Sequence, residues 1–303
     1  MMKLLKFIRD KDYRFIVLSN RSFYNDMDDK IYIEKLFKSY MGYSLNLNNP
    51  KTFNEKLQWL KLYDRKPRYT MMVDKYKVRE YIADKIGEEY LISLLGVWDD
   101  PDDIDFDSLP NKFVLKCNHD SGGLSICRDK KNFDANIAKK KLKKSLKTNY
   151  YYSGREWPYK NVPRKIIAEK YMVDDSNSDE FTDYKFFCFN GYVDCVMVCL
   201  DRNSGDPKFY FFDKDWKLKR LNKRGKEAPK DFTIPKPECI AEMFEIASKL
   251  SEGFPFVRVD LYQSYGKIYF GEMTFYPDSG FDSNILPEAD LYLGSLIDIN
   301  NIN

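Results

Sequence analysis

Two acidic residues in the segment 257–280 have the spacing of a metal site on a β-hairpin. Apolar and polar residues alternate along its first half, a turn follows near Gly266, and a second strand returns. With the turn centred on Gly266, Asp260 lies opposite Glu272, and both carboxylates share one face of the hairpin. Like charges in that position repel each other, so a divalent cation between them would remove the repulsion. Proteins usually bind Mg²⁺ through one or two carboxylates, and substrate phosphates supply further ligands.

Two further polar residues fall on the same face of the expected hairpin. Arg258 precedes Asp260 by two residues and lies opposite Thr274 in the same register. The spacing alone leaves two interpretations open. One is a magnesium site, and the other is a solvated hairpin in which Arg258 neutralises one of the acids.

A second set of residues could bind phosphate groups. Lys116 lies near the end of an expected strand over 112–117, and the loop Asn118–Ser125 (NHDSGGLS) follows it. Backbone N–H groups of such a loop can point at phosphate oxygens, and Lys116 would add a positive charge. The chain lacks the GxxxxGK[ST] pattern of a Walker loop, and an ordinary turn also accounts for these residues.

The same loop holds His119, the one histidine of the chain. An imidazole beside a phosphate site suits proton transfer, whereas hydrogen bonding within the loop or plain exposure would give it no catalytic role. A second turn, Asp278–Gly280 with Ser279 at its centre, follows Pro277. This turn could approach phosphates or an acceptor, or it could simply end the hairpin.

Three other segments carry groups that could contact a nucleotide or a sugar. Glu169 ends an expected strand, where a carboxylate and backbone groups can reach an adenine edge and ribose hydroxyls. The run Lys139–Lys147 carries six lysines and suits either a solvated helix face or a site for an anionic polysaccharide or phospholipid-linked substrate. The aromatic residues of Tyr150–Tyr159, together with Arg155, could stack on a sugar ring or pack the end of that helix.

The composition is that of a folded chain with a modest net charge. The 303 residues are 43% hydrophobic and 32% charged, and the net charge of +3 gives no reason to expect nucleic acid as a partner. The six cysteines form no CxxC pair, so a reducing cytoplasm is expected. The segment 1–9 suits a short docking helix or a peripheral membrane helix, and we expect no signal peptide or membrane span.

The periodicity changes from mostly helical to mostly strand-like near Pro110. Helices are expected over 52–63, with Thr52 and Glu55 as a capping box, and over 71–86, with Gly87 as the C-cap. Because hairpins such as the one at Asn190-Gly191 dominate the rest, the predicted fold class is α+β with antiparallel sheets. The later expected elements are helices over 134–147 and 236–252 and strands over 112–117, 165–169, 184–189, 192–200 and 209–212.

Taken in order, these pieces resemble the ATP-grasp superfamily. In detail they resemble its TupA-like branch, which is named for teichuronopeptide biosynthesis. The similarity covers about residues 48–295, and the combination of motifs is more specific than any one of them. The segments that carry the resemblance are NPKTFNEKLQWLKLYDR (49–65), VDKYKVREYI (73–82), KFVLKCNHDSGG (112–123), DYKFFCFNG (183–191), VRVDLY (257–262) and YFGEMTFYPDSGF (269–281).

The resemblance implies a role for each matching residue. The residues that would contact ATP phosphates are Lys75 and Lys116, with Ser121, Gly122 and Gly123 as the mobile phosphate loop. Those that would bind adenine are Glu169, Lys170 and Met172, and the one that would bind ribose is Asp183. The catalytic groups would be Lys217, as a phosphate-activating lysine, and Arg258, which would stabilise the reacting acyl-phosphate. The magnesium ligands would be Asp260, Glu272 and Thr274, and the acceptor site would draw on His119, Arg155, Asp278, Ser279 and Gly280.

One residue departs from the pattern of the superfamily. The second metal segment there usually reads E-x-N, whereas Glu272-Met273-Thr274 supplies a hydroxyl group in this chain. Threonine can still coordinate Mg²⁺ or hold a metal-bound water, so sites with one and with two magnesium ions both stay open.

The resemblance also implies an architecture and an activity. The expected ATP-grasp fold has a helical N-terminal region (1–110), a central subdomain with the phosphate loop (111–182) and a C-terminal subdomain with the magnesium site (183–303). The expected enzyme is an ATP-dependent carboxylate–amine ligase that works through an acyl-phosphate, with ATP and Mg²⁺ as cofactors. Its carboxylate substrate would be a small molecule or a glycan precursor, such as a uronic acid of a cell-surface polysaccharide. Its second substrate would be an amino acid or another amine, and the protein could associate peripherally with membrane-bound glycan assembly.

Other classes of function stay open from the residues. Asp103-Ile104-Asp105 and Asp105-Phe106-Asp107 are DxD patterns, which hold a metal on nucleotide-sugar diphosphates in glycosyltransferases of capsule or O-antigen synthesis. The same residues also suit an exposed acidic loop. An ATP-grasp kinase or a non-catalytic nucleotide-binding module would use the ATP-binding residues without joining an amine.

Overall fold

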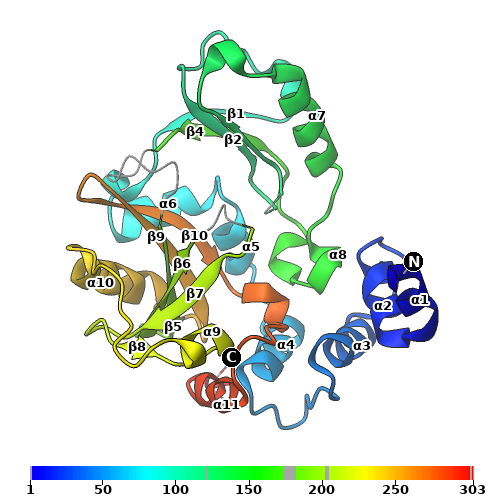
Figure 1. Cartoon of the computed structure of the whole chain (residues 1–303). Coiled ribbons are helices and arrows are strands. Elements are labelled where there is room, and N and C mark those ends of the chain that lie inside the picture. The colour runs from blue at the N-terminus through cyan, green and yellow to red at the C-terminus, as the bar shows by residue number, and fades with distance from the viewer. Residues whose placement is uncertain (1, 121, 173–181, 202–204, 301, 303) are drawn as a thin grey trace.

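Two antiparallel sheets with helices around them make up the body of the protein (Figure 1). The computed structural model describes residues 2–120, 122–172, 182–201, 205–300 and 302. All the paired strands in these residues run antiparallel, which confirms the predicted α+β fold class.

The smaller sheet lies at the top of Figure 1 and has four strands. Leu142 of helix α7 (Ala135–Leu146) packs against its buried apolar face. The strand order is β1 (Leu94–Trp98), β4 (Ile166–Lys170), β2 (Phe113–Cys117) and β3 (Leu124–Cys127). The sequence predicted β2 and β4 but missed β1 and β3, because short apolar runs do not distinguish a strand from part of a helix. β1 lies in the segment expected to be mostly helical, yet it pairs with β4.

The larger sheet has six strands and carries the carboxylate hairpin. Helix α10 (Ile240–Ser251) packs across it and buries Met243 and Leu250 in the main core. The strand order is β10 (Lys267–Thr274), β9 (Val257–Ser264), β5 (Asp183–Phe189), β6 (Tyr192–Leu200), β7 (Lys208–Phe212) and β8 (Leu218–Lys219). Asn190 and Gly191 join β5 to β6 with φ of 49° and 87°, as the Asn-Gly hairpin signal predicted.

The remaining elements are helical and surround the sheets. Thr52 and Glu55 form the predicted capping box at the start of α4. The helices of the N-terminal part are α1 (Met2–Arg9), α2 (Lys11–Ser19), α3 (Asp29–Met41), α4 (Phe53–Tyr63), α5 (Arg68–Val73), α6 (Val78–Lys85) and η1 (Glu88–Tyr90). The short helices further along the chain are η2 (Pro101–Asp103), η3 (Lys130–Asn132), α8 (Tyr151–Gly154), η4 (Trp157–Tyr159), α9 (Lys223–Glu227), η5 (Pro277–Gly280) and α11 (Pro287–Ser295).

The prediction of a single helix over 71–86 is wrong, because the chain forms two helices there, α5 and α6, with a break between them. The carboxylate of Asp74 accepts hydrogen bonds from the backbone N–H groups of Tyr76 at 2.9 Å and Lys77 at 3.2 Å. An aspartate that bonds its own backbone in this way competes with helix formation. The break leaves Lys75 between the two helices. Gly87, with φ of 118°, follows the end of α6 as predicted.

The hairpin β9–β10 has the predicted pairing, but a bulge produces it. The turn consists of Tyr265 and Gly266, so a regular ladder would place Gly271 opposite Asp260. The register shifts by one residue between Phe270 and Glu272, and Glu272 thereby comes to face Asp260. A Cβ atom at Gly271 would lie 2.6 Å from the Tyr262 ring and 3.0 Å from the Asp260 carbonyl oxygen, so the bulge favours glycine at this position.

Helix α11 lies close against the start of α4, and one glycine permits this approach. A Cβ atom at Gly294 would lie 2.2 Å from the Lys51 carbonyl oxygen and 2.6 Å from the Thr52 carbonyl carbon. We expect Gly294→Ala to lower the free energy of unfolding by about 1–3 kcal/mol, even though alanine favours a helix by about 1 kcal/mol. Urea unfolding measures this change. Gly122→Ala is the matched control, since its Cβ would meet nothing within 4 Å, and an equal loss of stability in both variants would contradict the prediction.

Candidate active site

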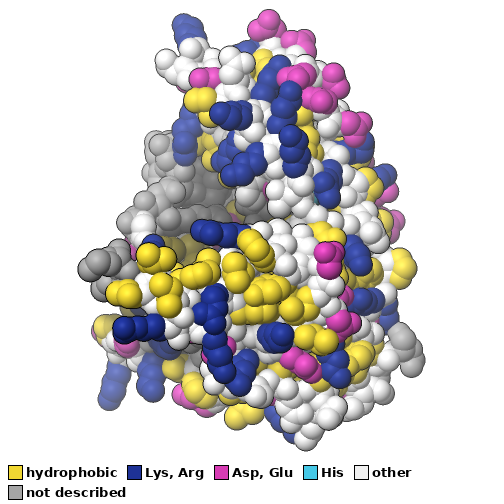
Figure 2. Space-filling view, turned by 90° about the vertical axis from the view of Figure 1, so that its right-hand side faces the viewer, with side chains coloured by type: hydrophobic (Ala, Val, Ile, Leu, Met, Phe, Trp, Pro, Cys, Tyr) yellow, Lys and Arg dark blue, Asp and Glu magenta, His cyan; other side chains and the backbone are white. Residues whose placement is uncertain are grey.

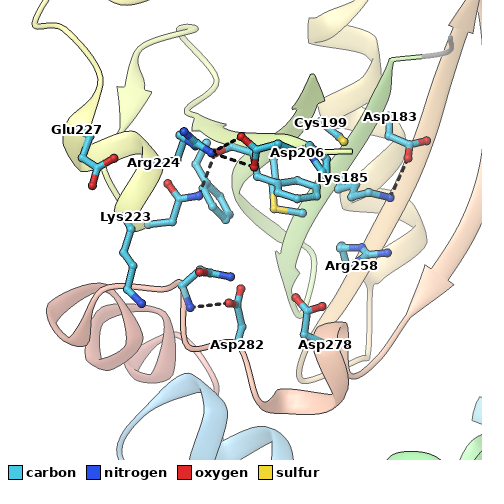
Figure 3. Close-up of a pocket in the computed structure, with 16 residues that line it drawn as sticks. Asp183, Lys185, Cys199, Asp206, Lys223, Arg224, Glu227, Arg258, Asp278 and Asp282 are labelled. Carbon is cyan, nitrogen blue, oxygen red and sulfur yellow. Dashed lines mark hydrogen bonds and ion pairs between the residues drawn. The ribbon is translucent and has the colours of Figure 1, made fainter. Parts of the chain in front are cut away.

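The candidate site begins on the larger sheet and opens into a cavity of ≈ 640 Å³ (Figure 3). Asp183, Lys185 and Arg258 line one end of this cavity, and residues of α9 line the other. Met197 and Phe211, from the neighbouring strands β6 and β7, form part of its apolar wall. A cavity with an apolar wall and a few convergent charges is a typical small-molecule site.

Asp260 lies at the centre of the charged groups and is almost completely buried, with 1% of its surface exposed. One carboxylate oxygen accepts a hydrogen bond from Arg258 Nε at 2.6 Å. The other accepts hydrogen bonds from Arg258 Nη2 at 2.7 Å and from Lys185 Nζ at 2.5 Å. Arg258 thus neutralises one of the acids, as the second interpretation predicts, but the carboxylate of Asp260 is buried and not solvated.

Glu272 faces Asp260 and is more accessible, with 37% of its side chain exposed. Its Oε1 atom accepts hydrogen bonds from Arg258 Nη2 at 3.3 Å and from the Thr274 hydroxyl at 3.2 Å. Burial alone would raise the pKa of Glu272, but Lys75, Arg258 and Lys185 lower it to about 2. Glu272 is therefore ionised at neutral pH, although solvent partly screens these attractions.

The guanidinium of Arg258 is also held in its charged form. Burial alone would lower the pKa of this guanidinium, but Asp260 and Glu272 raise it above its usual value. Its Nη2 atom also donates to the Thr274 hydroxyl at 3.1 Å. A fixed cation at the mouth of the cavity can stabilise negative charge that develops on a reacting group.

Lys185 belongs to the site, although the sequence analysis did not identify it. Its Nζ atom lies 2.5 Å from Asp260 and 3.3 Å from Asp183, and only 11% of its side chain is exposed. β5 pairs with β9 so that Lys185 stands beside Asp260. The sequence did contain a signal for this residue. A lysine two residues after an aspartate in an otherwise apolar strand places both side chains on one face, where they can form an ion pair.

Lys75 connects the hairpin to the loop that follows β2. Its Nζ atom donates a hydrogen bond to the Asp120 carbonyl at 2.7 Å and lies 4.0 Å from Glu272 Oε2. Its backbone N–H donates to the carbonyl of Asn118 at 3.1 Å. Burial lowers the pKa of Lys75, while Glu272 counteracts this effect. This lysine brings the two sheets together at the site.

The predicted phosphate loop packs against α7. The backbone N–H of Gly123 donates to Asp120 Oδ1 at 3.0 Å, and the other oxygen of Asp120 accepts a hydrogen bond from Ser145 Oγ of α7. Gly122 is exposed, and Ser121 lies outside the described residues. The N–H of Gly123 would therefore have to leave Asp120 before it could bind a phosphate.

His119 is buried next to the segment that follows α7. It is 2% exposed, its Nε2 atom lies 3.2 Å from the Thr148 carbonyl, and burial lowers its pKa. The imidazole is therefore neither exposed nor bonded within its own loop, because its partner Thr148 follows α7.

Lys116 and Glu169 form an ion pair on the smaller sheet. Lys116 Nζ lies 2.6 Å from Glu169 Oε2, and Arg79 Nη1 lies 3.4 Å from Glu169 Oε1. Lys170 is exposed and Met172 is half-buried at the end of this strand region. Residues 173–181, which continue the expected adenine-binding connection, lie outside the described residues.

The turn Asp278–Gly280 is held in a strained conformation beside the cavity. Asp278 and Ser279 have φ of 48° and 51°, a region that costs a residue with a side chain about 1–3 kcal/mol. Lys61 Nζ donates to the Ser279 carbonyl at 2.6 Å, and Gln58 Nε2 donates to the Gly280 carbonyl at 2.6 Å. Helix α4 therefore fixes the turn from behind, while Asp278 lines the cavity.

Two predicted residues lie away from this group. Arg155 is completely buried, and its Nη2 atom donates to the carbonyls of Tyr24 at 2.7 Å and Asn25 at 3.1 Å. The guanidinium also lies 4.2 Å from the ring centre of Tyr32, so Arg155 joins the N-terminal helices to α8. Lys217 is exposed next to β8 and does not line the cavity.

The two DxD patterns and the lysine run share another part of the surface. Asp105 Oδ1 accepts a hydrogen bond from its own loop, from the Asp107 N–H at 3.0 Å. Asp102 binds Lys143 of α7, and the exposed lysines of α7 form the dark blue group at the top of Figure 2. These contacts agree with an exposed acidic loop next to a solvated helix face.

The oxygen atoms of the hairpin are suitable ligands for a magnesium ion whose remaining coordination positions are filled by phosphate oxygens. Asp260, Glu272 and Thr274 offer oxygen atoms only, which are the ligands that Mg²⁺ prefers. Among the described residues, no group of three or more histidine, cysteine, aspartate or glutamate side chains forms a metal cage. The ion would also compete with Arg258 for the oxygens of Asp260.

The order of these groups along the chain matches one known family. A family profile described as TupA-like ATPgrasp matches residues 55–298. The chain belongs to the TupA-like ATP-grasp family. This membership confirms the resemblance found in the motifs, the ATP-grasp fold and the prediction of an ATP-grasp enzyme.

Solved structures of ATP-grasp proteins are similar to this TupA-like chain at low identity. The ATP-grasp ligase PsnB, solved with a phosphomimetic variant of its minimal precursor, Mg and ADP, is 10% identical, with a TM-score of 0.41 and coverage of 80% of this chain and 64% of PsnB. D-Alanine–D-alanine ligase from Helicobacter pylori is 13% identical, with a TM-score of 0.44 and coverage of 81% and 69%. L-Amino acid ligase from Bacillus licheniformis is 14% identical, with a TM-score of 0.45 and coverage of 84% and 57%.

This TupA-like chain spans 64% of the PsnB chain in the complex with the phosphomimetic variant and 57% of the L-amino acid ligase chain. A search of curated proteins gave no match. Among its described helices, none has the length and apolar character needed to cross a bilayer.

Proposed function

We propose that this TupA-like chain is an ATP-dependent carboxylate–amine ligase that works through an acyl-phosphate. The observation that supports it most is the group of Lys75, Glu272, Arg258 and Asp260, which opens at Arg258 into the ≈ 640 Å³ cavity. Phosphoryl transfer asks a protein mainly for positioning and charge neutralisation, and these residues supply both.

Each part of the site has a proposed role with ATP. Lys75 and Lys116 neutralise phosphate oxygens, and the loop at Gly122 and Gly123 covers them. Glu169, Lys170 and Met172 contact the adenine, and Asp183 binds the ribose. Lys217 joins the phosphates only if its strand region moves, because its side chain is exposed outside the cavity. In this arrangement the smaller sheet and the larger sheet act as the two subdomains that hold the nucleotide.

The metal is magnesium, with Asp260, Glu272 and the Thr274 hydroxyl as its ligands. Bound Mg²⁺ neutralises phosphate charge and polarises the phosphoryl group that is transferred. Lys185 holds Asp260 and Asp183 in place through its contacts with both carboxylates. Arg258 lies between the metal ligands and the cavity, where it can stabilise charge on the reacting acyl-phosphate.

The proposed reaction has two steps. A carboxylate oxygen of the first substrate attacks the γ-phosphorus of ATP, and the bond to ADP breaks. The nitrogen of an amine then attacks the acyl carbon, the carbon–oxygen bond to phosphate breaks, and the amine gives up a proton. The products are an amide, ADP and phosphate.

We further propose that the carboxylate comes from a cell-surface polysaccharide precursor, such as a uronic acid. The reaction would take place in the cytoplasm, at the inner membrane surface where such precursors are assembled. The support for this part is the name of the family alone. A screen across uronic acids and other carboxylates tests it directly.

The experiment for the proposed function is ADP release with Mg-ATP over a grid of carboxylates and amines. Release that depends on both partners and equals the amide formed is the expected result. A stable phosphorylated product without an amine would indicate a kinase. Binding of a nucleotide sugar but not of ATP would indicate a glycosyltransferase.

A further inference from the structure

Helix α1 exposes its apolar side to solvent. Leu4, Leu5 and Ile8 lie on one side of this helix and are 64%, 46% and 61% exposed. A helix on the surface of a soluble protein usually buries such a side against the core. Single exposed apolar residues need no explanation, but three of them side by side on one short helix indicate a surface that contacts an apolar partner.

The direction of this apolar side is fixed by helix α2. Asp10 caps the start of α2 and accepts a hydrogen bond from the Tyr13 N–H at 2.9 Å. Arg14 Nη1 of α2 donates to the Ile8 carbonyl at the end of α1 at 2.9 Å. The Lys6 ammonium lies 4.8 Å from the ring centre of Tyr13. The side of α1 that carries Lys6 therefore faces α2, and the apolar side points away from it.

Most of the charged residues of α1 and α2 are basic. Within residues 2–19, five side chains are basic and two are acidic. The basic side chains that are exposed are Lys3, Lys6, Arg9 and Lys11. A surface with both apolar and basic side chains is complementary to the surface of an anionic bilayer, where negative headgroups lie next to apolar chains.

Helix α7 places a second group of positive charge on the same face. Figure 2 is viewed from the side on which α1 and α2 lie, and it shows hydrophobic side chains below the dark blue lysines of α7. Asp102 neutralises part of this charge through Lys139 and Lys143. The exposed lysines of α7 that line a groove of ≈ 470 Å³ and form no ion pair with any described residue are Lys140, Lys144 and Lys147.

We propose that this face docks on the surface of a bilayer that contains anionic phospholipids. The apolar side of α1 enters the headgroup region, and the lysines of α7 bind lipid phosphates beside it. A shallow apolar contact and a basic patch are two weak signals that together give stable binding to a membrane. The inference does not depend on the ligase reaction, because it concerns a surface outside the cavity.

The charges of this face favour a bilayer over a second copy of the chain. A contact between two copies related by a twofold axis would bring the same surface of each copy together. The basic residues of α1 and α7 would then face the positive charge of the other copy, and like charges repel. A soluble anion would bind the lysines but leave the apolar side of α1 in water. A bilayer accommodates both kinds of group.

Sedimentation with vesicles tests the inference on the full chain, without ATP or substrates. We expect binding to vesicles of equal amounts of phosphatidylglycerol and phosphatidylcholine, and much less binding to phosphatidylcholine alone. Binding should fall in about 1 M salt, where the Debye length is about 3 Å. Equal binding to both kinds of vesicle, or none to either, would overturn the inference and leave the ligase function untouched.

Two double variants test the two parts of the surface separately. Lys140→Glu with Lys144→Glu should weaken binding about 10-fold or more, because each basic residue near an anionic surface contributes about 5-fold. Leu4→Ser with Ile8→Ser keeps the charge and should also weaken binding about 10-fold or more, because less apolar area leaves water. All four side chains are exposed, so both variants should fold, and the melting temperature checks this.

The matched controls change exposed residues of other surfaces. They are Lys249→Glu with Lys267→Glu, and Tyr265→Ser. Lys249 lies on α10, and the other two lie at the turn of the β9–β10 hairpin. Because α10 and this turn lie at the left of Figure 1, opposite α1, both controls should bind vesicles like the wild-type protein.

Two results with the variants would overturn the inference. Binding that the lysine variant loses and the α1 variant keeps would indicate an anion site without insertion into a bilayer. A dimer that the α1 variant breaks, in a protein that binds no vesicles, would assign this face to a second copy of the chain. Sedimentation velocity of the wild-type protein and of both variants measures the oligomeric state.

Discussion

Replacement of Glu272 by glutamine should lower the rate of ADP release by about 10²–10³, by analogy with the loss of one electrostatic stabiliser from an active site. The change removes the charge that Lys75 and Arg258 face and keeps the shape of the side chain. Because 37% of this side chain is exposed, the protein should stay folded. The rate is measured under saturating substrates, with the melting temperature as a check of folding.

Glu245→Gln is the control for this experiment. Glu245 is an exposed glutamate on α10 that does not line the cavity, and its replacement should leave the rate unchanged. A Glu272→Gln variant with nearly wild-type turnover would remove Glu272 from the site and with it the proposed magnesium ligands.

Replacement of Lys185 by methionine should destabilise the protein by about 3–5 kcal/mol, the usual cost of breaking a buried ion pair by removal of one partner. The lysine lies 2.5 Å from Asp260 and 3.3 Å from Asp183, and each of these acids is only 1% exposed. Methionine has a similar length but no charge, so the two carboxylates would lose this cation. Urea unfolding measures the loss in the free energy of unfolding.

A second substitution makes this prediction specific. In Lys185→Met combined with Asp183→Asn, one negative charge is removed as well, and part of the lost stability should return. If Lys185→Met lowers the free energy of unfolding by less than about 1 kcal/mol, the ion pair of Lys185 with Asp260 contributes little to stability. The role given to Lys185 in the site would then be wrong.

The facing carboxylates could be predicted from the sequence, but not the reason why they face each other. Alternation of polar and apolar residues placed Asp260 and Glu272 on one side of the hairpin. The actual turn at Tyr265 and Gly266 would have paired Asp260 with Gly271, and the bulge at Gly271 corrects the register. A bulge depends on the local fit of two strands, for which a sequence gives no regular pattern.

Contacts between distant segments were harder to predict. The sequence indicates an ordinary helical lysine at Lys61. In the structure this side chain is fully buried and donates a hydrogen bond to the carbonyl of Ser279, 218 residues later in the chain. Lys185 reads as an interruption in an apolar strand, and its role depends on the pairing of β5 with β9. Periodicity describes one element at a time, so the residues that join elements are the ones it misses.

The resemblance to a family supplied what periodicity did not. It implied that Lys75 contacts ATP phosphates, and in the structure Lys75 Nζ lies 2.7 Å from the Asp120 carbonyl oxygen, in the loop expected to bind them. It also proposed Lys217, which the structure leaves exposed outside the cavity.

In the proposed reaction, a carboxylate oxygen passes to phosphate through an acyl-phosphate. The most direct measurement uses a carboxylate substrate labelled with ¹⁸O on both oxygens, Mg-ATP and the amine partner. The label in the released phosphate is then read by mass spectrometry. We expect one ¹⁸O atom in each phosphate, because the carbon–oxygen bond breaks when the amine attacks. Unlabelled phosphate, with amide still formed, would contradict the account.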